Sequence, residues 1–431
     1  MLAVKQWEKK PMAQSARDAE LNAPARSGSQ LRVALLCALV ALCDGFDTQA
    51  IAFVAPVIAR EWGVEPGAFG PIFSAGLAGL ALGAFVFGSL ADRIGRRAVI
   101  LLCVTLFGLA SLATTQASSM GELAAWRILT GLGLGGVLPN LIAVTNESAT
   151  DRQKNSLVML MFCGFPLGAT IGGIVSAPLI EAAGWESVFI SGGIAPLAIM
   201  PLLFRYLPRG TIAQGSVKAG KVSQLFSSGR AAATLLLWTA FFSNLLVMYF
   251  LVNWLPSLLS MVGTTLSIAT LSTAMLNLGG IAGAFILSRL INGERAVIYL
   301  ACAYLFGMLS LLLIAQSAGN MSVMLIGAGL AGSIVVGGQI AMNAIAASLY
   351  PAEIRSTGVG WALGIGRIGS IIGPLIGGLL IGSGWLGTSP VLFAMVPTFV
   401  AAAALFALSR LDNMRLPVTG NLSEGRTGTA T

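Results

Sequence analysis

The chain has 431 residues, of which 56% are hydrophobic and only 10% are charged. Soluble proteins carry about 25% charged residues, so the composition indicates a polytopic membrane protein. The net charge of +8 does not indicate nucleic-acid binding, because the basic residues are spread over loops and tails. Histidine is absent, which excludes Ser-His-Asp hydrolysis and histidine-ligated metals. The five cysteines lie in apolar stretches without C-x-x-C spacing and are interpreted as packing residues.

Stretches of about 20 predominantly apolar residues are long enough to cross a bilayer as helices. Twelve such stretches follow along the chain: 31–58, 70–91, 98–117, 122–145, 156–179, 187–207, 231–256, 269–291, 296–316, 321–346, 357–381 and 390–410. The sequence therefore predicts an all-α polytopic membrane protein with six-helix bundles at 31–207 and 231–411. A central loop at 208–230 separates the bundles, and the polar tails at 1–30 and 412–431 are expected to be disordered and cytoplasmic.

An internal repeat relates the two groups of six spans. Gly95-Arg96-Arg97-Ala98-Val99-Ile100 recurs as Gly293-Glu294-Arg295-Ala296-Val297-Ile298, and Gly184-Trp185 recurs as Gly384-Trp385. Two parallel repeats predict pseudo-symmetric bundles around a central cavity that opens alternately to the two sides of the membrane.

The distribution of lysine and arginine predicts the orientation. With the N-terminus in the cytoplasm, all 25 basic residues lie on that side except Arg60, Arg127 and Arg367, as the positive-inside rule requires. An even number of spans then places both termini in the cytoplasm. Residues 1–30 contain no apolar segment of a signal peptide. We expect a multi-pass protein of a bacterial-type cytoplasmic (inner) membrane.

Asp44-Gly45-Phe46-Asp47 places two carboxylates one helical turn apart within the first apolar stretch. Ionised side chains inside a membrane are costly and usually face a protein interior or a wet cavity. We therefore interpret Asp44 and Asp47 as a proton or ligand site, the alternative being a helix end at the membrane surface. Because histidine is absent, either aspartate is the best candidate to carry a proton.

The stretch Gly88-Ser89-Leu90-Ala91-Asp92-Arg93-Ile94-Gly95-Arg96-Arg97 separates the second and third spans. It resembles the loop signature G-x-x-x-D-R-x-G-R-R of the major facilitator superfamily at every fixed position. The resemblance implies a cytoplasmic gate in which Asp92 accepts from a helix N-terminus or pairs with a cation of the other half. The residues expected to take part in gating are Gly88, Asp92, Arg93, Gly95, Arg96, Arg97, Glu147, Glu353 and Arg355.

Three further stretches resemble the aromatic acid:proton symporter family within that superfamily. They are Asp44 to Asp47, Arg127 to Glu147, and Glu353 to Arg367. The resemblance covers the helical core. It implies a secondary active transporter that imports an aromatic carboxylate of the benzoate, hydroxybenzoate or hydroxyphenylpropionate class by proton symport, without a cofactor or metal.

Arg127 and Arg367 also lie inside apolar stretches, so the four membrane charges sum to zero, as buried charges require. Arg127 is expected to pair with Asp44 or Asp47, or alternatively with nearby Glu122. The spans of the second half contain no acidic residue. Arg367 is therefore the first choice to bind the substrate carboxylate, with a latch to the Asp92 loop as the alternative.

Competition for an arginine would couple the two transported species. A carboxylate that loses its arginine to a substrate anion binds a proton more readily, so both move together. An aromatic substrate also needs flat walls and a few polar groups. The further residues expected to contact it are Phe46, Phe162, Tyr249, Trp254 and Trp361 by stacking, and Asn140, Asn253, Gln339 and Asn343 by hydrogen bonds. Each is alternatively an ordinary contact between helices.

Other functions remain open at this stage. One is proton-coupled efflux of aromatic acids or amphipathic compounds, and another is a non-transporting membrane sensor, although neither the tails nor 208–230 is long enough for a signalling domain. An enzyme is not expected, because no nucleophile–base pair, metal cluster or phosphate loop is visible. The expected partners are a small aromatic carboxylate, protons and the lipid bilayer, with the protein as a monomer and no nucleic acid.

Overall fold

A computed structural model describes residues 27–150, 153–208, 221–227, 229–290, 295–317, 320–351, 353–385 and 387–411. The long helices of the first half are α2 (Ser27–Glu61), α3 (Phe69–Ile94), α4 (Arg96–Thr114), α5 (Met120–Ser148), α6 (Lys154–Ala183) and α7 (Glu186–Tyr206). Those of the second half are α8 (Ala231–Met261), α9 (Leu266–Leu290), α10 (Ala296–Ala315), α11 (Met321–Leu349), α12 (Arg355–Gly382) and α14 (Met395–Ser409), preceded by the short α13 (Pro390–Phe393). Two short 3-10 helices, η2 (Pro66–Ala68) and η3 (Val222–Leu225), complete the described elements.

The helices agree with the predicted membrane-spanning fold. Eleven described helical segments are long and apolar enough to cross a membrane, and α2, with 35 residues, packs among them against α6, α7 and α5. Residues 27–30 of the predicted N-terminal tail belong to α2. The remaining tail residues, most of the central loop, and Gly293 and Glu294 of the repeat lie outside the described residues.

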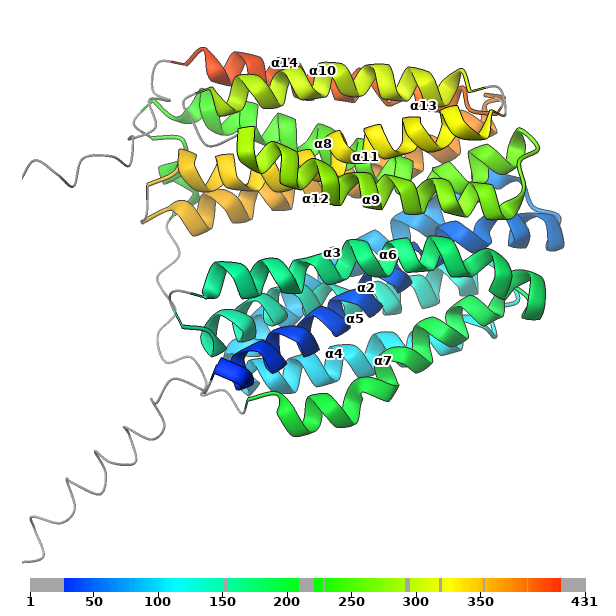
Figure 1. The fold of residues 1–431 in the computed structure, drawn as a ribbon, viewed down its shortest axis with the longest axis horizontal. Helices are drawn as coiled ribbons and strands as arrows, with labels where there is room; N and C mark the ends of the chain where they lie inside the picture. Colours follow the sequence, from blue (N-terminus) through cyan, green and yellow to red (C-terminus); the bar gives the residue numbers. More distant parts are fainter. Residues whose placement is uncertain are drawn as a thin grey trace, which may run out of the picture.

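The helices form two bundles with equivalent internal packing (Figure 1). In the first bundle α2 packs along α6, α3 along α5, and α4 along α5 and α7. In the second, α8 packs along α12, α9 along α11, and α10 along α11 and α14. Each helix of the first bundle thus has a counterpart in the second, which is the pseudo-symmetry that the sequence repeat predicts.

Glycines bring α3 and α5 into backbone contact. A Cβ atom added at Gly79 would lie 2.2 Å from the carbonyl oxygen of Ile128, and one at Gly83 would lie 2.0 Å from that of Leu132. Because the hydrophobic effect does not drive helices together in lipid, close packing of small residues holds membrane helices together. These glycines therefore fix the separation of the two helices that flank the site described below.

We expect Gly79→Ala to destabilise the protein by about 1–3 kcal/mol, since the added methyl group forces α3 and α5 apart. Thermal unfolding of the detergent-purified protein measures this effect. Gly364→Ala on α12 is the matched control, because a Cβ atom there meets nothing within 4 Å. Equal unfolding temperatures for the two variants would contradict this interpretation of the α3–α5 contact.

The two bundles join near the start of α3 and the end of α12. Ser74 Oγ donates to the carbonyl oxygen of Ile371 at 2.7 Å, and the Phe73 and Trp254 rings meet edge to face with centroids 5.1 Å apart. A Cβ atom at Gly70 would lie 3.1 Å from Gly378 Cα. Figure 1 shows the ribbons of the bundles farther apart at the opposite end, where the described chain begins and ends.

Candidate functional site

Two of the predicted membrane charges form a buried ion pair within the first bundle. Arg127 on α5 donates from Nη2 to Asp47 Oδ2 at 3.3 Å and to the Asp47 carbonyl oxygen at 3.1 Å. Asp47 is 0% exposed and Arg127 is 2% exposed. The Arg127 guanidinium also lies 5.6 Å from the centre of the Phe189 ring, a favourable cation–π position. The pair therefore links α2 to α5 and is protected from water.

The other partner that the sequence left open for Arg127 has a different role. Glu122 accepts hydrogen bonds from the backbone N–H and the hydroxyl of Ser118 at 2.9 and 3.1 Å. Its own backbone N–H donates to Ser119 Oγ at 3.3 Å. These contacts cap the start of α5, as acidic residues commonly do.

Ser111 on α4 supplies a third contact that the sequence did not indicate. Its Oγ donates to Asp47 Oδ1 at 2.6 Å and lies 3.2 Å from the carbonyl oxygen of Phe189. A Cβ atom at Gly192 would lie 3.1 Å from Asp47 Oδ1. Asp47 is thus enclosed by α4, α5 and α7, with a hydrogen bond to each of its carboxylate oxygens.

Asp44, one turn earlier on α2, has a different environment. It is 1% exposed, and its Oδ1 accepts from Thr48 Oγ1 at 3.1 Å. Its Oδ2 has no hydrogen-bond partner among the described residues, and no described cation forms an ion pair with it. The two aspartates are therefore distinguishable: Asp47 holds a counter-charge and Asp44 does not.

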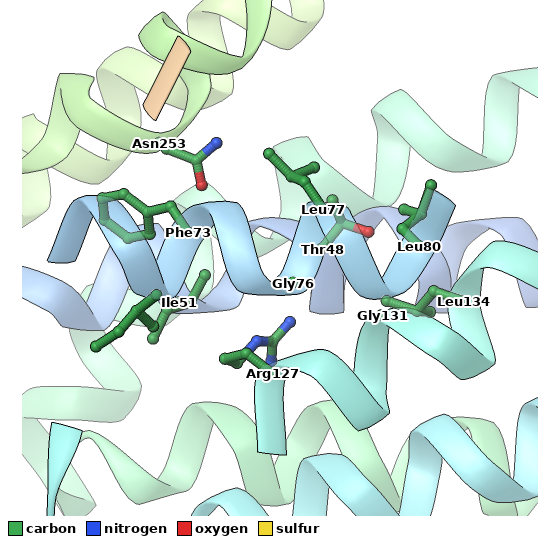
Figure 2. A pocket seen from close by; sticks show the side chains of 11 residues that line it. Thr48, Ile51, Phe73, Gly76, Leu77, Leu80, Arg127, Gly131, Leu134 and Asn253 are labelled. Atoms are coloured by element: carbon green, nitrogen blue, oxygen red, sulfur yellow. The ribbon is translucent and has the colours of Figure 1, made fainter. Parts of the chain in front are cut away.

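A small pocket lies beside the ion pair. Its polar lining residues are Thr48, Arg127 and Asn253, and the others are Ile51, Ile72, Phe73, Gly76, Leu77, Leu80, Gly131 and Leu134. Figure 2 shows the Arg127 side chain extending towards Gly76 on α3, with Phe73, Leu77 and Leu80 on the same helix. Asn253 reaches this pocket from α8, so both bundles contribute to it.

Arg127 retains free hydrogen-bonding capacity in this pocket. Its Nε and Nη1 atoms are buried and have no partner among the described residues. Unpaired buried donors are costly, and a guanidinium with free N–H groups is well suited to bind a carboxylate. The free donors of Arg127 suit an anion, and most of the residues around them are apolar.

Arg367, Tyr249 and Asn253 lie together on the facing helices α12 and α8. Arg367 is half-buried, and its Nη1 donates to the Tyr249 hydroxyl at 3.4 Å. Asn253 Nδ2 donates to the Tyr249 carbonyl oxygen at 2.7 Å. Tyr249 packs against Leu77 of the first bundle. Arg367 thus contacts Tyr249, and no contact between it and Asp92 appears among the described residues.

The remaining predicted contact residues lie in helix packing or on the surface. Trp254 Nε1 donates to the carbonyl oxygen of Pro374 at 2.9 Å, and Asn140 Nδ2 donates to that of Gly136 at 2.7 Å. Five other residues that were expected to contact the substrate do not line the described pocket. They are Phe46, Phe162, Gln339, Asn343 and Trp361.

Each of these five residues has other surroundings. Phe46 is buried, whereas Phe162 and Trp361 are each 43% exposed. Trp361 stacks on Trp238 with ring centroids 5.8 Å apart. Gln339 Nε2 donates to Asn343 Oδ1 at 3.2 Å, so these two form a polar contact within α11.

The predicted gating residues of the first half gather at the end where the bundles are apart. Arg96 Nε lies 2.8 Å from Glu147 Oε1, which links α4 to α5. Arg97 donates to the carbonyl oxygen of Phe204 and lies over its ring. Gly95, with φ of 87°, makes the turn between α3 and α4 that a glycine permits.

The other predicted gating residues lie at the end of α3 and at the start of α12. Gly88 is half-buried near the end of α3, and Asp92 and Arg93 are exposed there. Glu353 and Arg355 are exposed at the start of α12, where Arg355 Nε donates to the Tyr350 carbonyl oxygen at 3.4 Å.

Two pseudo-symmetric six-helix bundles with a charged pocket at their junction define a polytopic membrane transporter fold. The family model of the Major Facilitator Superfamily matches residues 37–338, and the chain belongs to this family.

The curated relatives are transporters of aromatic acids. The chain is 38% identical over 412 residues to the gallate transporter of Pseudomonas putida, covering 88% of this chain and 91% of that protein. It is 41% identical over 388 residues to the 3-(3-hydroxy-phenyl)propionate transporter of Escherichia coli, covering 89% and 96%. It is 37% identical over 419 residues to the 4-hydroxybenzoate transporter PcaK of Pseudomonas aeruginosa, covering 89% and 94%.

Solved structures share the fold. The crystal structure of a D-xylose-proton symporter aligns with a TM-score of 0.73 at 16% identity, covering 89% of this chain and 98% of that one. A bacterial homologue of the human lysosomal transporter Spinster, in an inward-facing and unoccupied conformation, aligns with a TM-score of 0.69 at 18% identity, covering 90% and 98%.

Proposed function

We propose that this protein imports an aromatic carboxylate of the benzoate, hydroxybenzoate or hydroxyphenylpropionate class together with protons. The observation that carries the proposal is the pocket beside Arg127, in which a buried guanidinium with free donors stands among apolar walls. The aromatic acids named for the gallate, hydroxybenzoate and hydroxyphenylpropionate transporters support the substrate class.

Arg127 is the residue that binds the substrate carboxylate in this proposal. It lines the pocket with two nitrogens that have no partner in the part of the chain that the structure describes, whereas Arg367, which the sequence favoured, donates to Tyr249. The ring then lies between the apolar walls, with Phe73 available for an edge or face contact. Asn253 is the polar side chain on the opposite bundle that can bond a ring hydroxyl.

Asp44 is the proton carrier in this proposal, and Asp47 holds Arg127 in place. An unpaired carboxyl costs less to bury in its protonated, neutral form than as an anion, and Asp44 has no ion-pair partner among the described residues. Thr48 connects the two functions, because it lines the pocket and donates to Asp44. One turn of α2 thus contains Asp44, which binds the proton in this proposal, and Asp47, which holds the substrate-binding Arg127 of α5.

Transport requires the two bundles to rock about the pocket. With both termini in the cytoplasm, the end at which the bundles join would face the outside of the cell. Gln49 on α2 and Asn277 on α9 bridge the bundles by two amide hydrogen bonds of 3.2 and 3.1 Å. Both are buried. Opening to the outside must break this pair.

Substitutions at Gln49 and Asn277 should have coupled effects on the stability of the protein. Asn277→Leu leaves the Gln49 amide buried without its partner, so we expect a lower unfolding temperature for the single variant. The double variant Gln49→Leu/Asn277→Leu should recover part of the loss, with a coupling of about 1 kcal/mol in a double-mutant cycle. Strictly additive effects on thermal unfolding would contradict a latch between these residues.

Uptake of a labelled panel of benzoate, hydroxybenzoates and phenylpropionates into cells that produce the protein tests the proposed function. Accumulation above that of cells without the protein, abolished by a protonophore, supports it. Uptake that a protonophore leaves unchanged contradicts proton symport, and net export from energised cells would favour efflux. No difference from cells without the protein would contradict transport of this substrate class.

A further inference from the structure

We propose that Gly76 determines which aromatic acids the pocket accepts, because its missing side chain keeps open the space beside the Arg127 guanidinium. The acids that it admits are those with bulk close to the carboxylate, such as ring substituents at position 2. This inference rests on the proposed function, since it concerns the same pocket.

Helix packing does not account for a glycine at position 76. The neighbouring glycines of this interface are needed for packing: an added Cβ would lie 2.2 Å from a backbone oxygen at Gly79 and 2.0 Å from one at Gly131. At Gly76 the nearest atoms to an added Cβ are the backbone oxygen, the Cβ and the Nε of Arg127, at 3.7, 3.8 and 4.0 Å, which is ordinary van der Waals contact. A glycine inside a helix is less stable than alanine, so the missing side chain beside Arg127 is the feature to explain.

The space beside Gly76 lies next to the donors that are free to bind an anion. Gly76 and Arg127 both line the pocket, and a Cβ at Gly76 would lie 4.0 Å from Arg127 Nε, which has no partner among the described residues. Figure 2 shows these two residues facing each other across the junction of α3 and α5. A methyl group at position 76 would therefore lie close to the carboxylate of a substrate bound to Arg127 and to the ring atoms next to that carboxylate.

The position of this steric overlap predicts which substrates bind less tightly. In a benzoate whose carboxylate is bound to Arg127, a substituent at ring position 2 lies beside the carboxylate, whereas a substituent at position 4 lies at the far end of the ring. Added bulk at Gly76 should weaken binding of 2-substituted acids and leave 4-substituted acids nearly unchanged. One misplaced methyl group in a close-fitting pocket changes discrimination by about tenfold or more.

The experiment compares 2-methylbenzoate with 4-methylbenzoate as competitors of labelled benzoate uptake in proteoliposomes. For Gly76→Ala, the inhibition constant of the 2-methyl acid should rise about tenfold relative to that of the 4-methyl acid, and Gly76→Val should enlarge the difference. Gly364→Ala, on an exposed position with open space around it, should keep the wild-type ratio. Methyl substituents are used because they change size without adding a hydrogen bond.

Three results would overturn the inference. An unchanged ratio in Gly76→Ala would show that position 76 does not select substrates. Failure of Gly76→Ala to fold would show that the space is needed for packing, as at Gly79. A wild-type protein that takes up no aromatic acid would remove the proposed function and this inference with it, whereas the first two results leave the proposed function standing.

Discussion

Asn in place of Asp44 is expected to reduce proton-driven accumulation of the aromatic acid to the level of protein-free vesicles. An asparagine retains an oxygen that accepts from Thr48, and it removes a carboxyl group that has no ion-pair partner in the described part of the chain. The fold should therefore be preserved while the proton-binding group is lost. A substitution at Asp44 should therefore remove proton binding with little effect on the stability of the fold.

Two assays in the same proteoliposomes distinguish proton coupling from substrate binding. Asp44→Asn should retain exchange of internal for external substrate, which needs no net proton movement, and should lose accumulation driven by a pH gradient. Gly364→Ala is the control, because the position is exposed and an added Cβ meets nothing within 4 Å; it should accumulate the acid like the wild type. Wild-type accumulation by Asp44→Asn would exclude Asp44 as the proton carrier.

Asp47→Asn is expected to act on stability first. It leaves the Arg127 cation buried without its counter-charge, and removing one partner of a buried ion pair costs about 3–5 kcal/mol. Ser111 can still donate to the remaining oxygen of residue 47, but this hydrogen bond does not neutralise the arginine. We expect a markedly lower unfolding temperature and less folded protein in the membrane.

A second substitution separates the charge effect from the loss of a functional group. The double variant Asp47→Asn/Arg127→Met removes both charges and should recover much of the stability, because neither partner is left buried alone. Transport should remain absent, since the carboxylate-binding residue is gone. Thermal unfolding and uptake measured on the same preparations test both statements, and wild-type stability of Asp47→Asn alone would contradict them.

The fold was predictable because the membrane restricts the possible structures. Length and apolar composition determine a spanning helix, so the twelve stretches match the order of the long helices. The helix ends were less predictable: α2 spans Ser27–Glu61 and α5 spans Met120–Ser148, beyond the predicted 31–58 and 122–145. Counting apolar residues stops at the polar caps, whereas backbone hydrogen bonding continues through them.

The charged residues of the site could be recognised in the sequence, but the sequence left more than one possible ion-pair partner for Arg127. Asp44 and Asp47 stand one turn apart, so the rotation of α2 and the position of α5 decide which of them meets Arg127. Ser111 and Gly76 could not be recognised, because hydroxyl groups and glycines are frequent in membrane helices. Their role depends on atoms that are distant in the chain.

Aromatic side chains were the least informative residues for the substrate site. Trp361 and Phe162 lie in apolar stretches like those of Phe73, yet both are 43% exposed, and Phe73 lines the pocket. A tryptophan or phenylalanine is equally compatible with lipid, with helix packing and with a ring-binding wall. The face on which it stands is set by the packing of the whole bundle.

The pH inside proteoliposomes tests aromatic acid:proton symport most directly. A trapped pH indicator should report acidification of the lumen when benzoate or a hydroxybenzoate is added outside at alkaline pH, where little of the acid crosses unaided in its neutral form. We expect faster acidification with the wild-type protein than in protein-free vesicles, and a rate at the protein-free level for Asp44→Asn. Uptake of the labelled acid by the wild-type protein without any accompanying acidification would contradict it.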